Sequence, residues 1–174
     1  MGNQVIQQQV NEWYHAYSND LYNYIFFMIK EHDQSKDILQ DTFVRAYDNY
    51  SSFRGGNEKS WLFRIARNVT IDYIRKKKPI SYIIESFSAI KASDKTPEQL
   101  MVLNETEQQL YHALSKVKRS YRDVIVLRKI KGFSISESSQ ILGWSENKVK
   151  VNLYRGMEAL RKELLKEGYT HETI

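Results

Sequence analysis

Cysteine is absent from this chain of 174 residues, which excludes disulfide bonds, thiolate nucleophiles and cysteine-ligated metal sites. The histidines are scattered without the spacing of metal ligands, at His15, His32, His112 and His171. The sequence also lacks a glycine-rich phosphate loop and a nucleophile motif. We therefore expect no enzymatic activity, no metal, no cofactor and no small-molecule substrate. The lack of cysteine fits a reducing compartment, so the expected localisation is cytoplasmic.

Long apolar runs are lacking as well. The longest purely apolar run, residues 25–29, is far shorter than the roughly 20 residues that a transmembrane helix needs. The first ten residues have neither the basic region nor the apolar region of a secretion signal. Neither export nor membrane insertion is expected.

Glycine and proline are scarce, with seven and two residues, and no segment shows a sustained two-residue alternation. This pattern predicts an all-α fold. Pro79 and Pro97 bracket a segment that follows a cationic helix end and precedes a new amphipathic run. We interpret residues 79–97 as a linker between two small helical domains, 1–78 and 98–174. A short packed helix inside one domain is the alternative for this apolar segment.

Three helical segments are expected in the first domain. Apolar residues recur at helical spacing from Trp13 to Met28, which predicts one long helix or two helices broken near residues 18–20. A second helix, residues 35–50, buries one side, formed by Leu39, Phe43, Ala46, Tyr47 and Tyr50. Two glycines then require a loop, and a third helix covers residues 61–77.

A helix-turn-helix pattern lies between residues 134 and 161 of the second domain. Ser134 and Glu137 have the spacing of a capping box at the start of a short helix. Gly143 supplies the turn, and Ser145 caps a second helix. Two short helices around a tight turn, the second rich in cations, are typical of a DNA-reading motif. A surface helical hairpin with ordinary solvated charges is the alternative.

The second helix of this motif has two faces. Its buried stripe has members three or four residues apart: Val149, Leu153, Gly156 or Met157, Leu160 and Leu164. The side chains left outside suit phosphate oxygens and base edges in a major groove, and they are Lys148, Lys150, Asn152, Tyr154 and Arg155.

The charge of the chain also favours a polyanionic partner. The net charge is +5 and the isoelectric point is about 9.2. Basic residues concentrate in residues 64–78 and in residues 116–131, and each of these stretches contains a single acidic residue. One acidic patch stands out against this background, on the outer side of the helix at residues 35–50: Asp37, Gln40 and Asp41. Ordinary solvated helix residues are the alternative interpretation of this patch.

The order of these segments resembles the extracytoplasmic-function sigma factors, the two-domain bacterial subunits that start transcription with RNA polymerase. Residues 35–47, SKDILQDTFVRAY, resemble the family's second conserved region. Residues 53–76 resemble the part that captures and melts the promoter strand at the minus-ten element. Residues 114–162 follow the fourth conserved region. The resemblance extends from residue 21 to residue 166.

The resemblance implies three sets of contacts. Core RNA polymerase would be bound by Asp37, Gln40 and Asp41. Minus-ten promoter DNA, as a single strand, would be bound by Phe53, Arg54, Asn57, Arg64, Arg67, Asn68, Arg75, Lys76 and Lys77. Duplex promoter DNA at the minus-thirty-five element would be read by Lys148, Lys150, Val151, Asn152, Tyr154 and Arg155. Core packing is the alternative role for Phe53 and the favoured role for Trp61. The family further implies an anti-sigma factor, which is membrane-embedded in many cases.

Three features depart from the family pattern. Lys148 stands where many relatives have threonine, which is expected to change the bases that are read. Gly156 stands where alanine is common, and it should weaken the helix by up to about 1 kcal/mol unless close packing requires it. The linker has only Glu85 and Asp94 as acidic residues, so we expect it to act as a tether.

Two other functions compete with the sigma factor interpretation. A helix-turn-helix regulator would bind duplex DNA without polymerase, and it would have no need of the acidic patch. An inactive adaptor would sequester a partner through residues 25–29, but the basic recognition helix argues against it.

Overall fold

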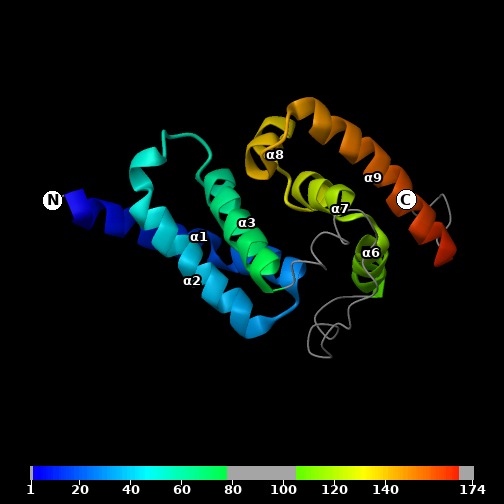
Figure 1. Ribbon diagram of the computed structural model, residues 1–174, viewed down its shortest axis with the longest axis horizontal. Coiled ribbons are helices and arrows are strands. Elements are labelled where there is room, and N and C mark those ends of the chain that lie inside the picture. Colours follow the sequence, from blue (N-terminus) through cyan, green and yellow to red (C-terminus); the bar gives the residue numbers. More distant parts are fainter. Residues whose placement is uncertain (1, 78–104, 169–174) are drawn as a thin grey trace. The chain divides into compact units, whose positions relative to one another are not determined.

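The computed structural model describes residues 2–77 and 105–168, and the chain divides into two compact units (Figure 1). Every regular element in these two ranges is a helix, which confirms the all-α prediction. The first unit contains α1 to α3, and the second contains α6, α7 and α9. The proposed linker at residues 79–97 lies outside the described residues, and the domain boundaries stay predictions.

The first unit consists of α1 (Gly2–Ile29), α2 (His32–Asp48), the short 3-10 helix η1 (Tyr50–Ser52) and α3 (Glu58–Lys77). α1 is one continuous helix, which decides between the two predicted alternatives. α2 begins three residues earlier than expected and ends at Asp48, so Tyr50 belongs to η1.

The three long helices of this unit pack on one another around an apolar core (Figure 1). The core residues lie on one side of each helix, in the first and second positions of successive turns: Leu21, Tyr24 and Ile25 on α1, Ile38, Leu39 and Phe43 on α2, and Leu62, Phe63 and Ala66 on α3. Burial of each large side chain contributes about 1.5–3 kcal/mol. The expected burial of Tyr47 is wrong, because this residue lies at the edge of the buried side of α2 and is 37% exposed.

The second part of the chain contains α6 (Glu105–Lys116), α7 (Arg119–Ile125), the π-helical turn η2 (Val126–Ile130), α8 (Ile135–Leu142) and α9 (Glu146–Lys166). The helical stretch of α7 and η2 thus changes its form along its length. Its last turn widens, and the N–H of Lys131 donates to the carbonyl of Val126 at 2.9 Å, the five-residue spacing of a π-helix.

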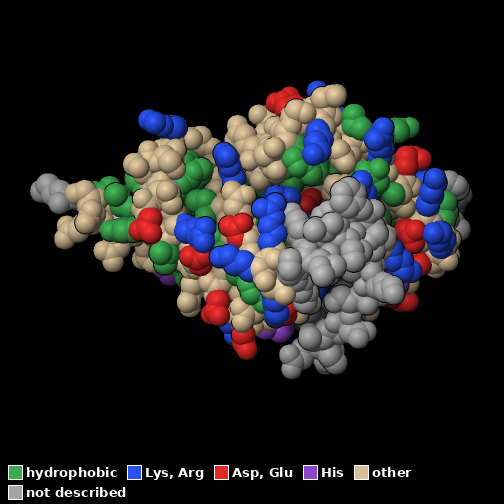
Figure 2. Space-filling model, viewed as in Figure 1, with side chains coloured by type: hydrophobic (Ala, Val, Ile, Leu, Met, Phe, Trp, Pro, Cys, Tyr) green, Lys and Arg blue, Asp and Glu red, His purple; other side chains and the backbone are tan. Residues whose placement is uncertain are grey.

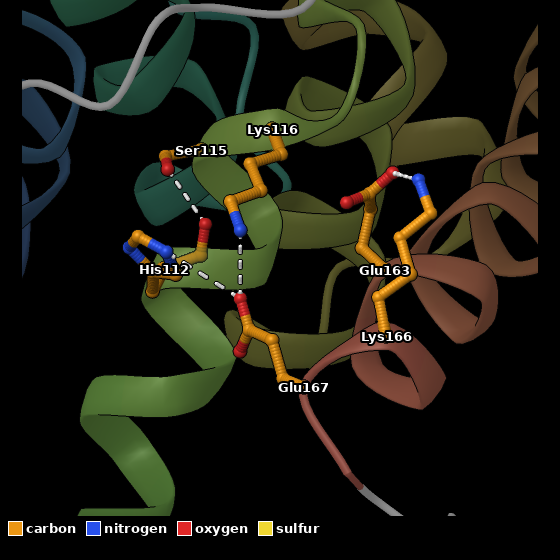
Figure 3. A network of polar contacts seen from close by, with 6 residues as sticks. All are labelled: His112, Ser115, Lys116, Glu163, Lys166 and Glu167. Carbon is orange, nitrogen blue, oxygen red and sulfur yellow. Dashed lines mark hydrogen bonds and ion pairs between the residues drawn. The ribbon is translucent and has the colours of Figure 1, made fainter.

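One core cluster of the second unit brings residues of α6, α7 and α9 together. It contains Ala113, Leu114, Val117, Ile125, Leu160 and Leu164. A polar network also links α6 to the end of α9 (Figure 3). Glu167 Oε1 accepts a hydrogen bond from Lys116 Nζ at 3.1 Å and lies 3.5 Å from His112 Nε2. The network therefore holds the end of α9 against α6.

Gly156 lies where α9 packs closely against α7. A Cβ atom at this position would lie 3.0 Å from Tyr121 Cβ and 3.3 Å from Tyr121 Cα. Neither atom is the end of a flexible side chain, so the neighbouring helix would have to shift. Close packing therefore favours glycine here, which offsets its low helix propensity.

Gly156→Ala is expected to destabilise the protein. Overpacking lowers the free energy of unfolding by about 1–3 kcal/mol. The higher helix propensity of alanine offsets up to about 1 kcal/mol of this loss. We expect a net loss of about 1 kcal/mol, measured by chemical denaturation followed by circular dichroism. The exposed control Lys162→Ala on the same helix should change the stability by less than about 0.5 kcal/mol. A rise in stability for Gly156→Ala would contradict the packing argument.

Candidate nucleic-acid and partner interfaces

The helix-turn-helix is capped as the sequence predicts. The N–H of Ser134 donates to Glu137 Oε2 at 2.7 Å, and the N–H of Glu137 donates to Ser134 Oγ at 3.0 Å. Gly143 has a φ of +66°, the left-handed conformation that ends α8. Ser145 Oγ accepts from the N–H of Lys148 at 3.2 Å and caps α9. The start of the recognition helix is therefore fixed by local hydrogen bonds.

The exposed side of α9 carries the predicted minus-thirty-five residues. Val149, Gly156 and Leu160 are buried on one side of the helix. The other side exposes Lys148, Lys150, Val151, Tyr154 and Arg155. Tyr154 is 72% exposed, an unusual position for a large aromatic side chain outside an interface. This face presents cations and an aromatic ring to a partner.

Asn152 differs from its predicted neighbours. It is half-buried, and its Nδ2 donates to the carbonyl of Lys148 at 2.8 Å. Its amide is thus engaged with the backbone of its own helix. To contact a base, the Asn152 amide would have to break its hydrogen bond to the Lys148 carbonyl or use its remaining donor and acceptor.

The predicted minus-ten residues lie on α3 and on the loop before it. Gly55 and Gly56 have φ values of +84° and +92°, which shape the loop. Asn57 Oδ1 accepts from the N–H of Ser60 at 3.0 Å, so this side chain caps α3. Arg54 in the loop is exposed, as are four residues on α3: Arg64, Asn68, Arg75 and Lys76. Arg67 is half-buried.

Phe53 belongs to an aromatic cluster. Its ring centroid lies 5.3 Å from that of Trp13 and 5.3 Å from that of Trp61, and Trp13 also contacts Tyr50 at 5.6 Å. Trp13 is 1% exposed, whereas Phe53 and Trp61 are half-buried. The cluster gives Phe53 and Trp61 a packing role. The base contact of Phe53 stays a prediction and would use the exposed part of its ring.

Lys77 is held at the end of α3. Its Nζ donates to Glu31 Oε2 at 2.7 Å and to the hydroxyl oxygen of Tyr73 at 2.9 Å. The bond to Glu31, and then the bond to Tyr73, raise the pKa of Lys77. This lysine ties α3 to the loop between α1 and α2, so a phosphate contact would compete with an existing ion pair.

The acidic patch lies on the outer side of α2. Asp37 and Gln40 are exposed, and Asp41 Oδ2 accepts from Arg45 Nε at 3.1 Å in an exposed pair. Val44, on the same side of the helix, is 57% exposed. The patch therefore combines carboxylates with an exposed apolar side chain, a composition suited to a protein partner.

Two known protein families match this chain, one in each half. Residues 13–80 match the Sigma-70 region 2 family and residues 107–160 match the Sigma-70, region 4 family. Over 169 residues, 92% of this chain and 87% of the relative, it is 39% identical to the ECF RNA polymerase sigma factor SigX of Bacillus subtilis (strain 168). This chain belongs to the ECF sigma factors. As such it is a transcription initiation factor, an alternative sigma factor that directs RNA polymerase to promoters.

Further relatives agree with this assignment. The sigma factor is 37% identical to the ECF RNA polymerase sigma factor SigW of Bacillus subtilis (strain 168), over 85% of this chain and 84% of SigW. Its structure resembles the sigma factor RpoE from Bartonella quintana, solved in complex with the anti-sigma factor NepR. The TM-score is 0.71 at 27% identity, and the match covers 93% of this chain and 99% of RpoE. The polymerase-independent regulator is not favoured.

Several absences hold for residues 2–77 and 105–168 of the sigma factor. In these ranges, no helix is long and apolar enough to cross a membrane. The same residues contain no group of three or more His, Asp or Glu side chains that is suited to a metal ion.

The basic stretch at residues 116–131 of the sigma factor exposes fewer cations than the sequence implies. Arg119 and Arg122 are buried, together with Asp123. On one face of the molecule, Lys and Arg side chains are interspersed with Asp and Glu side chains (Figure 2). The total charge of the sigma factor is therefore a poor guide to its DNA-binding surface, and the exposed face of α9 is a better one.

Sequence reasoning missed two residues beside these surfaces of the sigma factor. Val44 was recognisable as an apolar residue off the buried stripe of α2. Trp144 lies directly before the cap of α9, and Lys148 Nζ lies 4.5 Å from the centroid of its ring. The position before a helix cap favours an apolar residue, but that preference does not identify a cation partner.

Proposed function

We propose that this sigma factor reads duplex DNA at the minus-thirty-five element with α9, captures the minus-ten strand with α3 and its preceding loop, and binds core polymerase through α2. The observation that carries the proposal is the exposed face of α9, which presents Lys150, Tyr154 and Arg155 on a capped helix whose other side is buried. We also propose the boundaries 1–78, 79–97 and 98–174 for the two domains and their linker.

The minus-thirty-five role rests on the chemistry of α9. Lys150 and Arg155 are exposed cations that suit phosphates and the acceptor atoms of guanine. Val151 lies opposite the buried stripe, where an apolar contact with a thymine methyl group is available. Each good bidentate base contact contributes about 1–3 kcal/mol of discrimination, so two or three suffice to select an element.

The minus-ten role rests on the exposed side of α3. Asn68 and Arg64 lie one turn apart on this side, so an amide that pairs with base edges stands beside a cation that pairs with phosphates. Stacking on an aromatic ring holds a base that has left the duplex with about 1–3 kcal/mol. The binding energy would drive strand opening, and the chemistry of transcription would belong to the polymerase. The chain itself is proposed to have no enzymatic activity.

Two further partners and a location follow from this proposal. Core RNA polymerase would contact Asp37, Gln40 and Asp41, whose carboxylates favour a basic partner surface. An anti-sigma factor would cover the polymerase-binding or DNA-binding surfaces, and the RpoE relative in complex with NepR supports this class of partner. Transcription takes place in the cytoplasm of bacteria, which is the proposed site of action.

Run-off transcription tests this function. Bacterial core polymerase is supplied with a library of promoter fragments, with and without the full chain. We expect sequence-specific transcripts only when the chain is present, and their loss with the Lys150→Ala/Arg155→Ala variant. The matched control Arg161→Ala/Lys162→Ala removes two exposed cations from the far half of α9 and should retain the transcripts. Specific binding of duplex DNA by the chain alone, without any transcript, would instead establish the regulator.

A further inference from the structure

We propose that Trp144 is a positioning residue that holds the Lys148 ammonium at the start of α9 for contact with a DNA phosphate. This inference rests on the proposed minus-thirty-five role of α9. It adds a residue outside the recognition helix, and it assigns Lys148 to the DNA backbone instead of to the bases.

Lys148 is held at three points. Its N–H donates to Ser145 Oγ at 3.2 Å, and its carbonyl accepts from Asn152 Nδ2 at 2.8 Å. Its Nζ lies over the ring of Trp144, 4.5 Å from the centroid. The backbone bonds fix the origin of the side chain, and the aromatic ring fixes its charged end.

Trp144 is fixed independently of Lys148. Its N–H donates to the carbonyl of Ser139 at 3.1 Å, and its own carbonyl accepts from Ser139 Oγ at 2.6 Å. Both bonds use the backbone of Trp144 and tie it to α8. The indole is half-buried, so one part packs against the protein while its face is available to the lysine.

A cation at this position needs such support. The N-terminal turn of a helix carries a partial positive charge, which disfavours a lysine there. Attraction to the face of an indole offsets this effect and limits the rotamers of a flexible side chain. The lysine is then already ordered when DNA arrives, so less conformational entropy is lost on binding.

The direction of the side chain favours a phosphate over a base. Helical side chains tilt toward the N-terminus, and Lys148 reaches back to a residue that precedes the helix. Its ammonium therefore lies over Trp144, which precedes α9, whereas the exposed residues Lys150, Val151 and Tyr154 follow Lys148 along the helix. A compact ammonium at a helix N-terminus suits a phosphate oxygen, which backbone N–H groups in the same turn also attract.

The test is a double-mutant cycle on the holoenzyme. Core polymerase with the full chain binds a duplex fragment that carries the selected minus-thirty-five element, and the affinity is measured over a range of salt concentrations. Lys148→Ala should weaken binding roughly fivefold at 0.15 M salt and reduce the salt slope by about 1. Trp144→Ala should have a similar effect, whereas Trp144→Phe should retain most of the affinity. The double variant should bind no more weakly than Lys148→Ala.

Matched controls separate positioning from folding. The effects of Trp144→Ala and Lys150→Ala should simply add, because the ammonium over the indole is that of Lys148. Thermal denaturation reports whether each variant is folded. Losses that add in the Trp144/Lys148 double variant would overturn the proposal, as would an unchanged salt slope in Trp144→Ala. A change in preference among base sequences at constant slope would assign Lys148 to a base and refute the phosphate contact. If the wild-type holoenzyme shows no selective binding to the element, the proposed function itself fails.

Discussion

Replacement of Asp37, Gln40 and Asp41 together by alanine is expected to abolish promoter-directed transcription while the helical fold is retained. All three side chains lie on the outer side of α2, and none contributes to the buried set of that helix. Alanine has a higher helix propensity than each of them, so α2 itself should not be weakened. The loss should therefore come from the interface with core polymerase.

The expected effect on polymerase binding is large. Removal of carboxylates that pair with a basic partner surface costs several kcal/mol when the pairs are desolvated, and a loss of about 3 kcal/mol corresponds to roughly 100-fold in affinity. The affinity of the chain for core polymerase is measured directly, and run-off transcription is measured in parallel. The association rate should fall at low salt more than at high salt, because exposed charges steer the encounter.

A charge-matched control tests whether the position of the charges matters. Glu12→Ala/Glu105→Ala also removes two carboxylates, from exposed positions on α1 and α6, and should bind core polymerase normally. Val44→Ala asks whether the exposed apolar side chain beside the patch contributes to the same interface. Full transcription by the triple variant would remove α2 from the polymerase interface.

Trp13→Ala is expected to have the largest effect on stability. Trp13 is 1% exposed, and its ring contacts Tyr50, Phe53 and Trp61 with centroid distances between 5.3 and 5.6 Å. Truncation of a buried tryptophan costs about 3–5 kcal/mol, a large share of the stability of a small domain. Chemical denaturation should show this loss in the first unit. The loop at residues 53–57 should also lose its anchor, so capture of the minus-ten strand should weaken.

Two controls accompany this variant. Trp13→Phe keeps an aromatic ring in the cluster and should cost much less than the alanine substitution. Val5→Ala changes a residue of the same helix that is 63% exposed, and it should be nearly neutral. A Trp13→Ala protein with a stability within about 1 kcal/mol of the wild type would show that the cluster is not a structural anchor.

The helix-turn-helix shows which features residue spacing predicts correctly. The capping box of Ser134 and Glu137, the glycine turn and the Ser145 cap all involve residues no more than three positions apart. Their hydrogen bonds depend on local backbone geometry, so spacing alone predicts them. The exposed face of α9 follows in the same way from the helical period, since the buried stripe defines the side that is left for a partner.

The sequence did not predict which residues of different helices contact one another. The resemblance marks Gly156 as a departure from the family pattern, but only the packing of α7 against α9 shows that Tyr121 lies close to where a Cβ atom of residue 156 would be. The role of Phe53 was equally ambiguous. An aromatic residue in a loop can stack on a base or pack in the core, and the sequence does not show which residues surround it. Lys77 looked like a phosphate contact, and the structure pairs it with Glu31, 46 positions earlier.

The sequence by itself determined the all-α class, the caps of the helix-turn-helix and the buried stripe of α9, because each of these depends on residue type and short-range spacing. Its resemblance to known proteins determined the family. Only the tertiary structure decided which cations are exposed, which aromatics pack together and where the Lys148 ammonium rests. These features depend on the directions in which side chains from different segments meet. Those directions are set by packing against residues distant in the sequence and by the conformation of the turns, neither of which residue spacing contains.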